Sequence, residues 1–324
     1  HYQLLSLSEK EKFISEMGSL DFELAFSLYE KISRQKFPVK HKIGAYPSRI
    51  FTIPENPDEQ AHWEEARILG ESIISKNKIA VLIVAGGHGS RLGFNGPKGM
   101  FPISPVKSKS LFQLFAESAR ALSLRYKVVV PLLIMTDTEI LPEVKNFFKT
   151  HNFFGLEEQT VHLFGQEALP TLTVDGKLIL KDKTHLFVNP NGHGGCVKAL
   201  HDSGLLKKLI EDGYSDLFYC QIDNPLVKMM DPAFVGYHKA EDSEISTKVV
   251  RRRSCDEKVG IFVAENGKAK VIEYSELGPD NRCVLDNHGR IRDWAGNTAI
   301  HMISLVFVQR LNERGFSLPY HQAI

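Results

Sequence analysis

The 324-residue sequence has few cysteines, and their spacing shows no pairing. The four are far apart, and none belongs to a C-x-x-C motif: Cys196, Cys220, Cys255 and Cys283. Zinc sites and disulfide frameworks usually show close or regular spacing, so both are disfavoured. We therefore expect four reduced thiols in an intracellular protein, with the cytoplasm as its default location.

The sequence also lacks an excess of charge, a long apolar run and any internal repeat. Lys and Arg number 40 against 39 Asp and Glu, which argues against a general binder of nucleic acid or of membrane surfaces. No apolar run is long enough for a membrane span, and the first residues lack the pattern of a signal peptide. Because the sequence begins with His1 rather than Met, we expect a fragment of a longer protein. The hydrophobic content of 43% is typical of globular proteins.

Hydrophobic periodicity divides the sequence into regions. Apolar residues recur at three- and four-residue spacing over the first 75 residues or so, which predicts helices, including one over 58–75 with Asp58 as N-cap. We interpret residues 1–76 as a helical N-terminal extension packed on the main domain. From residue 79, apolar strands alternate with amphipathic helices, as in βαβ units. The predicted strands are 79–85, 128–135, 161–164 and 217–222, and the predicted helices are 111–124, 139–151 and 192–211.

Beyond residue 232 the pattern favours further strands, at 248–251, 259–264, 269–274 and 303–308. Hairpin turns are predicted at 265–267 and 287–289, and the arginine triplet 251–253 is most simply a solvated turn. The whole predicts an α/β fold with a mixed, mainly parallel sheet over residues 77–324. In such sheets ligands bind beyond the carboxyl ends of the strands.

The predicted strand over 79–85 ends in a glycine-rich loop, Gly86-Gly87-His88-Gly89-Ser90-Arg91-Leu92-Gly93, followed by Gly96-Pro97-Lys98-Gly99-Met100. Glycines let the backbone adopt positive φ and approach a ligand closely. Loop N–H groups at a strand end can bind phosphate oxygens, and Arg91 and Lys98 add positive charge. A tight turn without a ligand is the alternative, but the two cations favour phosphate binding.

This loop differs from two common phosphate-binding motifs. No lysine follows a glycine in the frame G-x-x-x-x-G-K-[ST], and Gly93 falls one residue late for G-x-G-x-x-G. Neither a P-loop NTPase nor an NAD-dependent enzyme is indicated.

The pattern A-G-G-x-G-[ST]-R-L-G followed by P-K-G-M resembles the signature of the UDP-N-acetylhexosamine pyrophosphorylases. These belong to the wider UDP-sugar pyrophosphorylase group of nucleotidyltransferases, and six motifs here follow the family's order. The resemblance implies a Rossmann-like, GT-A-like nucleotidyltransferase fold. It implies that Gly86, Gly87 and Gly89 wrap the phosphates of UTP. Arg91 would stabilise the departing pyrophosphate, and Lys98 the phosphates at the reacting centre.

A second motif ends the predicted strand over 217–222, where Asp223 precedes Asn224. A carboxylate at the tip of a parallel strand can hold a divalent cation against phosphates. On the pattern alone, an aspartate there more often starts a turn. The stretch from Asp223 to Asp231-Pro232 resembles the family segment whose aspartate holds the catalytic Mg²⁺. The resemblance therefore implies that Asp223 is a Mg²⁺ ligand.

Two segments match the family's contacts to the base. Gln166 precedes Leu169-Pro170, and its amide offers a donor and an acceptor for the edge of uracil. A surface glutamine with local bonds is the alternative, and Gly165 stands where the family usually has a second glutamine. Gly192 lies in a second glycine-rich turn before a predicted helix. The resemblance implies that Gln166 and Gly192 bind UTP.

The resemblance assigns the sugar to His193, Glu273, Tyr274 and Asn297. Glu273 and Tyr274 match the family's sugar-binding strand, although such a pair could also be cross-strand surface. His193 departs from the N-acetylhexosamine enzymes, which have asparagine there. The Gly-His-Gly arrangement is that of UDP-glucose and broad-specificity UDP-sugar pyrophosphorylases.

The expected activity is uridylyl transfer from UTP to a hexose 1-phosphate with Mg²⁺, first of all N-acetylglucosamine 1-phosphate. A UDP-glucose or broad-specificity pyrophosphorylase is the alternative, and an inactive UDP-sugar-binding protein is the non-enzyme alternative. The family continues past the position of Leu318 into a C-terminal domain with a further lysine, which we expect to be missing here. Neither nucleic acid nor membrane is expected as a partner, and nothing in the sequence indicates an oligomeric state.

Overall fold

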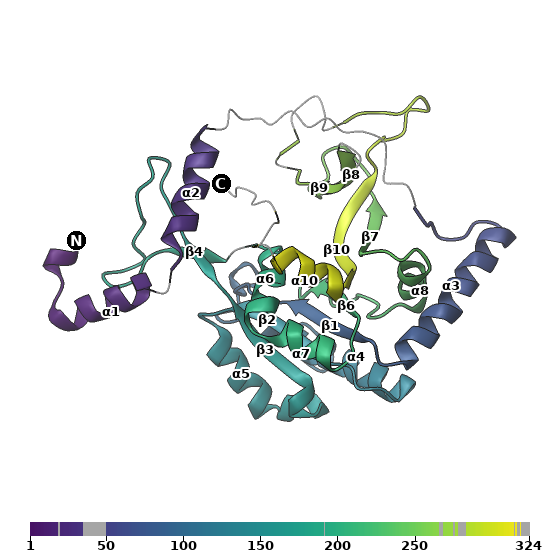
Figure 1. The fold of residues 1–324 in the computed structure, drawn as a ribbon, viewed down its shortest axis with the longest axis horizontal. Coiled ribbons are helices and arrows are strands. Elements are labelled where there is room, and N and C mark those ends of the chain that lie inside the picture. The colour runs from purple at the N-terminus through teal and green to yellow at the C-terminus, as the bar shows by residue number, and fades with distance from the viewer. Residues whose placement is uncertain are drawn as a thin grey trace.

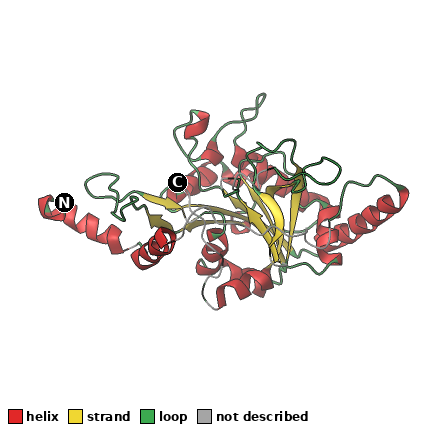
Figure 2. Ribbon diagram, turned by 90° about the horizontal axis from the view of Figure 1, so that it is seen from above, coloured by secondary structure: helices red, strands yellow, loops and turns green. Residues whose placement is uncertain are grey.

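The computed structural model describes residues 1–18, 20–34, 50–190, 192–265, 268–274, 276–277, 283–313, 315 and 318. Its centre is an eight-stranded sheet with helices on both faces (Figures 1 and 2). The strands of this sheet are β1 Ile79–Val84, β2 Leu132–Asp137, β3 Val161–Gln166, β6 Asp216–Gln221, β7 Ile245–Arg251, β8 Ile261–Glu265, β9 Lys268–Ile272 and β10 Ala295–Ser304. Two short strands form a separate sheet, β4 Ala168–Pro170 and β5 Val188–Pro190. The helices are α1 Leu7–Gly18, α2 Phe22–Arg34, α3 Pro57–Ser75, α4 Leu111–Tyr126, α5 Leu141–Thr150, α6 Gly195–Asp202, α7 Leu205–Glu211, α8 Pro232–Ala240 and α10 Leu305–Glu313.

The large sheet has the order β3-β2-β1-β6-β10-β8-β9, and β7 pairs with β10. β1 runs parallel to β2 and β6, and β3 runs parallel to β2. β10 is antiparallel to β6, β7 and β8. All six residues of β1 are buried, which is why this strand reads as a continuous apolar run. The predicted mixed α/β fold is confirmed.

Apolar side chains fill both faces of this sheet. Phe112 of α4 and Phe148 of α5 are fully buried on one face. Leu200 of α6 and Leu206 of α7 occupy the other face, together with residues of α10. Each large apolar side chain that is fully buried contributes about 1.5–3 kcal/mol. These apolar layers on the two faces of the sheet hold the carboxyl ends of the parallel strands in place.

The N-terminal helices lie at opposite ends of the molecule. α1 and α2 lie beside the β4–β5 sheet, whereas α3 packs against α8 (Figure 1). Tyr29 of α2 donates to the carbonyl of Val174 at 2.9 Å. The predicted helices are therefore present, while the division of the chain at residue 76 stays a prediction.

The N-cap of α3 differs from the predicted one. Asn56 is the cap, and its side chain accepts a hydrogen bond from the Glu59 N–H. Pro57 occupies the first helical turn, where its lack of an N–H costs nothing. The prediction of Asp58 as N-cap is therefore wrong by two residues.

Two other predicted elements are wrong. Residues 303–308 are not one strand, because β10 ends at Ser304 and α10 begins at Leu305. Apolar residues flank Ser304 on both sides of this boundary, which hid the change from strand to helix. The predicted helix over 192–211 is two helices, α6 and α7, separated by Gly204 at φ +75°. The predicted turn at 287–289 lies between bridge partners Leu285 and Ile291, whereas that at 265–267 lies partly outside the described residues.

The cysteines also correct an expectation. Cys255 and Cys283 form a disulfide, with Cα atoms 5.1 Å apart, while Cys196 and Cys220 are free and buried. The prediction of four reduced thiols is therefore wrong for one pair. The pair was hidden because the fold, and not the spacing in sequence, brings the two residues together. None of the helices described here is long and apolar enough to cross a membrane.

Candidate functional site

The candidate site lies where the carboxyl ends of four parallel strands meet. Val84, at the end of β1, pairs with Gln221 of β6 and with Met135 of β2. Gln166, at the end of β3, pairs with Asp137 of β2. The chain builds β2 and β3 on one side of β1 and then crosses to β6 on the other side. A crevice forms at such a reversal of strand order, and ligands of α/β sheets bind there.

The glycine-rich loop leaves β1 at this edge and folds back on itself. The Lys98 N–H donates to the carbonyl of Gly87 at 2.9 Å, and the Gly89 N–H donates to Gly96 at 2.8 Å. The N–H of Gly89 is thus occupied inside the loop. Within the described part of the chain, the N–H groups of Gly86 and Gly87 have no backbone carbonyl as partner. These two glycines can therefore donate to a ligand.

The loop after β1 is joined to the loop after β6 by an ion pair. Lys98 Nζ lies 2.9 Å from Asp223 Oδ1. The Lys98 side chain is 20% exposed and the Asp223 side chain 54% exposed, so the carboxylate faces the crevice. A Cβ atom on Gly87 would lie 3.5 Å from Lys98 Nζ. The structure therefore brings together the predicted catalytic lysine, one loop glycine and the predicted metal ligand.

Arg91 lies on the exposed turn Ser90–Leu92 of the same loop. It forms no ion pair with the residues that the structure describes. Its guanidinium is therefore available to an anion approaching the loop.

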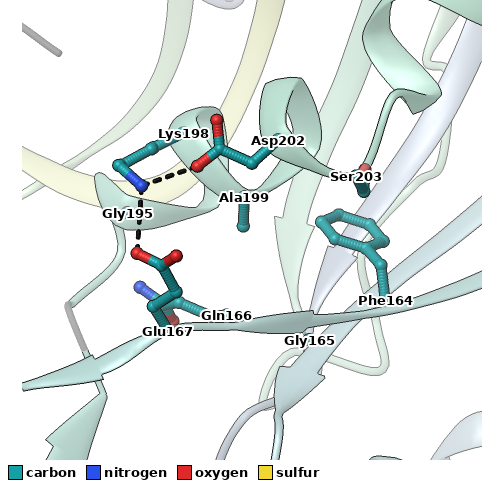
Figure 3. A pocket seen from close by; sticks show the side chains of 9 residues that line it. All are labelled: Phe164, Gly165, Gln166, Glu167, Gly195, Lys198, Ala199, Asp202 and Ser203. Carbon is teal, nitrogen blue, oxygen red and sulfur yellow. Dashed lines mark hydrogen bonds and ion pairs between the residues drawn. The ribbon is translucent and has the colours of Figure 1, made fainter. Parts of the chain in front are cut away.

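Gln166 is buried, with 3% of its surface exposed. Its Nε2 donates to the carbonyl of Gly192 at 2.6 Å, which joins two predicted UTP-binding residues from β3 and from the turn before α6. This bond uses one of the two Nε2 hydrogens, so the Oε1 acceptor and the second N–H are left for a ligand. Gln166 also borders a cavity of about 230 Å³ between β3 and α6, where Lys198 bridges Glu167 and Asp202 (Figure 3).

His193 lies over the end of β6. Both of its ring nitrogens are 3.3 Å from Nε2 of Gln221. His301 of β10 is close by, with Nδ1 2.9 Å from Oγ1 of Thr247. Burial, together with the nearby His193, lowers the pKa of His301 to about 4. Gln221 and His301 were not among the predicted site residues. For Gln221 the usable signal was its position at the end of the strand that leads to Asp223.

The other three predicted sugar-binding residues come from β10 and from the segment just after β9. The Asn297 N–H donates to the carbonyl of Gly260 at 2.8 Å, and a Cβ atom on Gly260 would lie 3.2 Å from Oε1 of Glu273. Glu273 and Asn297 thus both lie next to Gly260. Asn297 Oδ1 accepts from the Ala299 N–H at 3.0 Å, inside a bulge of β10. Tyr274 is 42% exposed.

A second ion-pair cluster was not among the predicted site residues. Lys248 of β7 and Lys228 lie 2.7 and 2.9 Å from the two carboxylate oxygens of Asp231. Burial opposes ionisation of Asp231, but the two ion pairs outweigh it and lower the pKa of the carboxyl. A lysine inside a predicted strand was the signal for this cluster.

The residues present fit a magnesium ion held with substrate. The described residues contain no group of three or more metal-ligating side chains, and Asp223 is a single exposed carboxylate. Mg²⁺ commonly binds through one or two carboxylates and completes its shell with water and substrate phosphates. Asp223 at the mouth of the glycine loop is compatible with that arrangement.

The mixed sheet, the glycine loop at its switch point and the facing acidic strand end define an α/β domain of the nucleotidyltransferase type. The sequence profile of the UTP–glucose-1-phosphate uridylyltransferase family matches residues 28–318. The chain therefore belongs to this family, and the resemblance seen in the glycine-rich loop is confirmed.

Individual relatives agree with this assignment. The chain is 36% identical to UDP-N-acetylhexosamine pyrophosphorylase-like protein 1 of Xenopus tropicalis, over 82% of this chain and 53% of that protein. It is 34% identical to UDP-N-acetylglucosamine pyrophosphorylase of Saccharomyces cerevisiae, over 84% of this chain and 57% of that protein. The crystal structure of the uridine diphosphate N-acetylglucosamine pyrophosphorylase from Trypanosoma brucei is similar, with a TM-score of 0.80 and 28% identity over 97% of this chain and 64% of that one. The chain spans about half the length of the first two relatives.

Proposed function

We propose that the protein transfers the uridylyl group of UTP to a hexose 1-phosphate, giving a UDP-sugar and pyrophosphate. The observation that carries this proposal is the 2.9 Å ion pair between Lys98 and Asp223 at the mouth of the glycine loop. It supports the proposal because it brings a cation and a carboxylate capable of holding a metal together in the crevice where ligands of such sheets bind. Membership of a uridylyltransferase family supports the same reaction.

In the proposed reaction, a phosphate oxygen of the hexose 1-phosphate attacks the α-phosphorus of UTP. The bond between the α-phosphorus and the bridging oxygen breaks, and pyrophosphate leaves with that electron pair. The sugar phosphate is already ionised, so no general base is required. The chain's task is to align two anions and to neutralise charge that develops on the leaving group.

Two cations of the loop have separate roles in this proposal. Lys98, held by Asp223, contacts the phosphates at the reacting centre, while exposed Arg91 stabilises the departing pyrophosphate. Gly86 and Gly87 donate their N–H groups to the triphosphate. Mg²⁺, when bound by Asp223, water and the phosphates, supplies further neutralisation of charge.

The base would be selected by Gln166. Its Nε2 is bound to the Gly192 carbonyl at 2.6 Å, so its Oε1 is oriented as an acceptor. Uracil carries an N3–H donor, whereas cytosine has a lone pair at that position. We expect Gln166→Ala to lower the preference for UTP over CTP by about 10- to 100-fold, the range for one buried hydrogen bond. The ratio of kcat/KM for the two nucleotides measures this effect.

The sugar would lie between His193 and the pair Glu273 and Asn297, with Tyr274 at the edge. N-acetylglucosamine 1-phosphate is the first candidate because the relatives named above carry that chemistry in their names. His193 favours glucose 1-phosphate as the second candidate. A rise in the ratio of N-acetylglucosamine to glucose turnover in His193→Asn would identify this side chain as a determinant of sugar choice.

The test of the reaction is pyrophosphate release by the full-length protein with UTP, Mg²⁺ and each of the two sugar phosphates in parallel. We expect release with N-acetylglucosamine 1-phosphate that depends on both substrates. UTP binding without release from any hexose 1-phosphate would instead indicate a UDP-sugar-binding protein.

A further inference from the structure

The disulfide closes a loop that holds part of the candidate sugar site. Cys255 follows β7 and Cys283 precedes β10, with a sequence separation of 28. The loop between them includes the β8–β9 hairpin, together with Gly260, Glu273 and Tyr274. The cross-link therefore lies at the base of the segment that would contact the sugar.

The hairpin has few other attachments to the large sheet. In the part of the chain that the structure describes, β8 pairs with β10 at a single position, Gly296 with Ile261. The Asn297 N–H adds one hydrogen bond to Gly260. The apolar side chains of the hairpin form a small cluster separate from the two main layers. The disulfide thus adds a covalent link across the base of a segment that has few other contacts with β10.

One end of the cross-link is fastened to the start of β10. Arg252 is buried, with 4% of its surface exposed, so the predicted solvated turn is wrong for this residue. Its Nη2 donates to the carbonyl of Cys255 at 2.9 Å, and its Nη1 donates to Asp293 at 3.2 Å. Its N–H donates to Trp294 at 2.8 Å. Cys255 is thereby tied to the residues just before Asn297.

The two classes of cysteine differ in accessibility. Cys283 is exposed and Cys255 is half-buried, so a reductant can reach the disulfide. Cys196 and Cys220 are fully enclosed, and burial raises the pKa of each thiol to about 12. Thiol chemistry follows accessible thiolate, so reaction is confined to the Cys255–Cys283 pair.

We propose that this disulfide is a redox-sensitive clasp on the sugar end of the site, a proposal that rests on the proposed function for the identity of that ligand. A dithiol reductant transfers two electrons and two protons to the disulfide, giving two protein thiols and the oxidised reductant. Reduction breaks this covalent link and leaves the hairpin attached to β10 by its non-covalent contacts, so the hairpin becomes more mobile and the affinity for the hexose 1-phosphate falls. UTP contacts are spared, because Lys98, Asp223 and Gln166 lie on the parallel side of the sheet.

The first test counts thiols. Alkylation of the denatured protein without reductant is expected to label the two free cysteines, and alkylation after dithiothreitol all four. Hydrogen exchange is then compared between the two states. We expect faster exchange over 261–272 after reduction and unchanged exchange over 79–84. Four labelled cysteines without reductant, or equal exchange at 261–272, would overturn the proposal.

The kinetic test compares oxidised and reduced protein. We expect KM for the hexose 1-phosphate to rise about fivefold or more on reduction, because a preorganised loop becomes mobile, with the Kd of UTP nearly constant. The double variant Cys255→Ser with Cys283→Ser should have the higher KM and no response to reductant. Cys196→Ala is the matched control and should keep the response. If no pyrophosphate is released in any state, the proposed function fails, while thiol counting and hydrogen exchange still decide whether the clasp exists.

Discussion

His301 gives a quantitative prediction about stability at acid pH. This residue of β10 lies beside Tyr219, with their ring centres 5.2 Å apart, and bonds Thr247 through Nδ1. Burial and the neighbouring His193 lower its pKa from 6.5 to about 4. This shift is worth about 3 kcal/mol, since each pKa unit corresponds to about 1.4 kcal/mol.

The sign follows from proton binding in the two states. Between pH 6.5 and about pH 4, unfolded His301 binds a proton that the folded residue does not bind. The free energy of unfolding therefore falls as the pH decreases through this window. Above pH 6.5 both states are neutral at this residue, and its contribution no longer changes.

Urea unfolding of the wild type and of His301→Gln from pH 7 to pH 4.5 measures the contribution of His301 to the free energy of unfolding. Glutamine can keep a hydrogen bond to Thr247 but does not titrate. We expect the wild type to lose about 2–3 kcal/mol more than the variant over this range. NMR titration of the histidine side chains measures the pKa of His301 directly. An imidazole pKa of 6 or higher for His301, or parallel stability curves, would refute the reasoning.

Two further predictions concern packing and buried charge. Gly236→Ala places a Cβ atom 1.7 Å from the Ala66 carbonyl oxygen and should lower the free energy of unfolding by about 2–3 kcal/mol. Gly18→Ala is the helical control, because nothing lies within 4 Å of the added Cβ atom, and it should change the free energy of unfolding by less than about 1 kcal/mol. Equal effects of the two variants in thermal unfolding would contradict the close crossing of α3 and α8. Asp216→Asn removes the fully buried carboxylate that lies 2.5 Å from Lys239 Nζ and 3.2 Å from His238 Nε2 and should cost about 3 kcal/mol at pH 7. Burial opposes ionisation of Asp216, but hydrogen bonding outweighs it and lowers the pKa of the carboxyl below 3.8. The stabilisation by Asp216 should therefore persist down to about that pH and be lost below it. Loss of this stabilisation already near pH 5 would contradict a lowered pKa.

Local sequence signals predicted the parallel half of the sheet well. The apolar run Ile79–Val84 requires burial on both faces, and the glycines after it require a loop at the strand end. Asp223 likewise follows an apolar strand. Because parallel strands end at one edge, the proximity of the loop and Asp223 followed from the element pattern. The 2.9 Å contact between Lys98 and Asp223 required the structure.

The antiparallel half was less predictable, because its decisive contacts are long-range. The Cys255–Cys283 bond joins residues with no recognisable spacing. The boundary between β10 and α10 lies between Ser304 and Leu305, and one serine among apolar residues is too weak a signal to mark the change from strand to helix. The burial of Arg252 depends on backbone carbonyls of Cys255 and Asp293, which no pattern of side chains reveals.

The most direct test of the central claim is the pyrophosphate-release kcat of Lys98→Met beside Lys208→Met in the full-length protein. Lys98 pairs with Asp223 in the crevice, whereas Lys208 pairs with Asp212 on the outer surface of α7. We expect Lys98→Met to lower kcat by about 100-fold or more, as loss of one electrostatic contact to a transition state does. Lys208→Met should leave kcat unchanged. A Lys98→Met enzyme with near wild-type kcat would show that the reacting centre lies elsewhere.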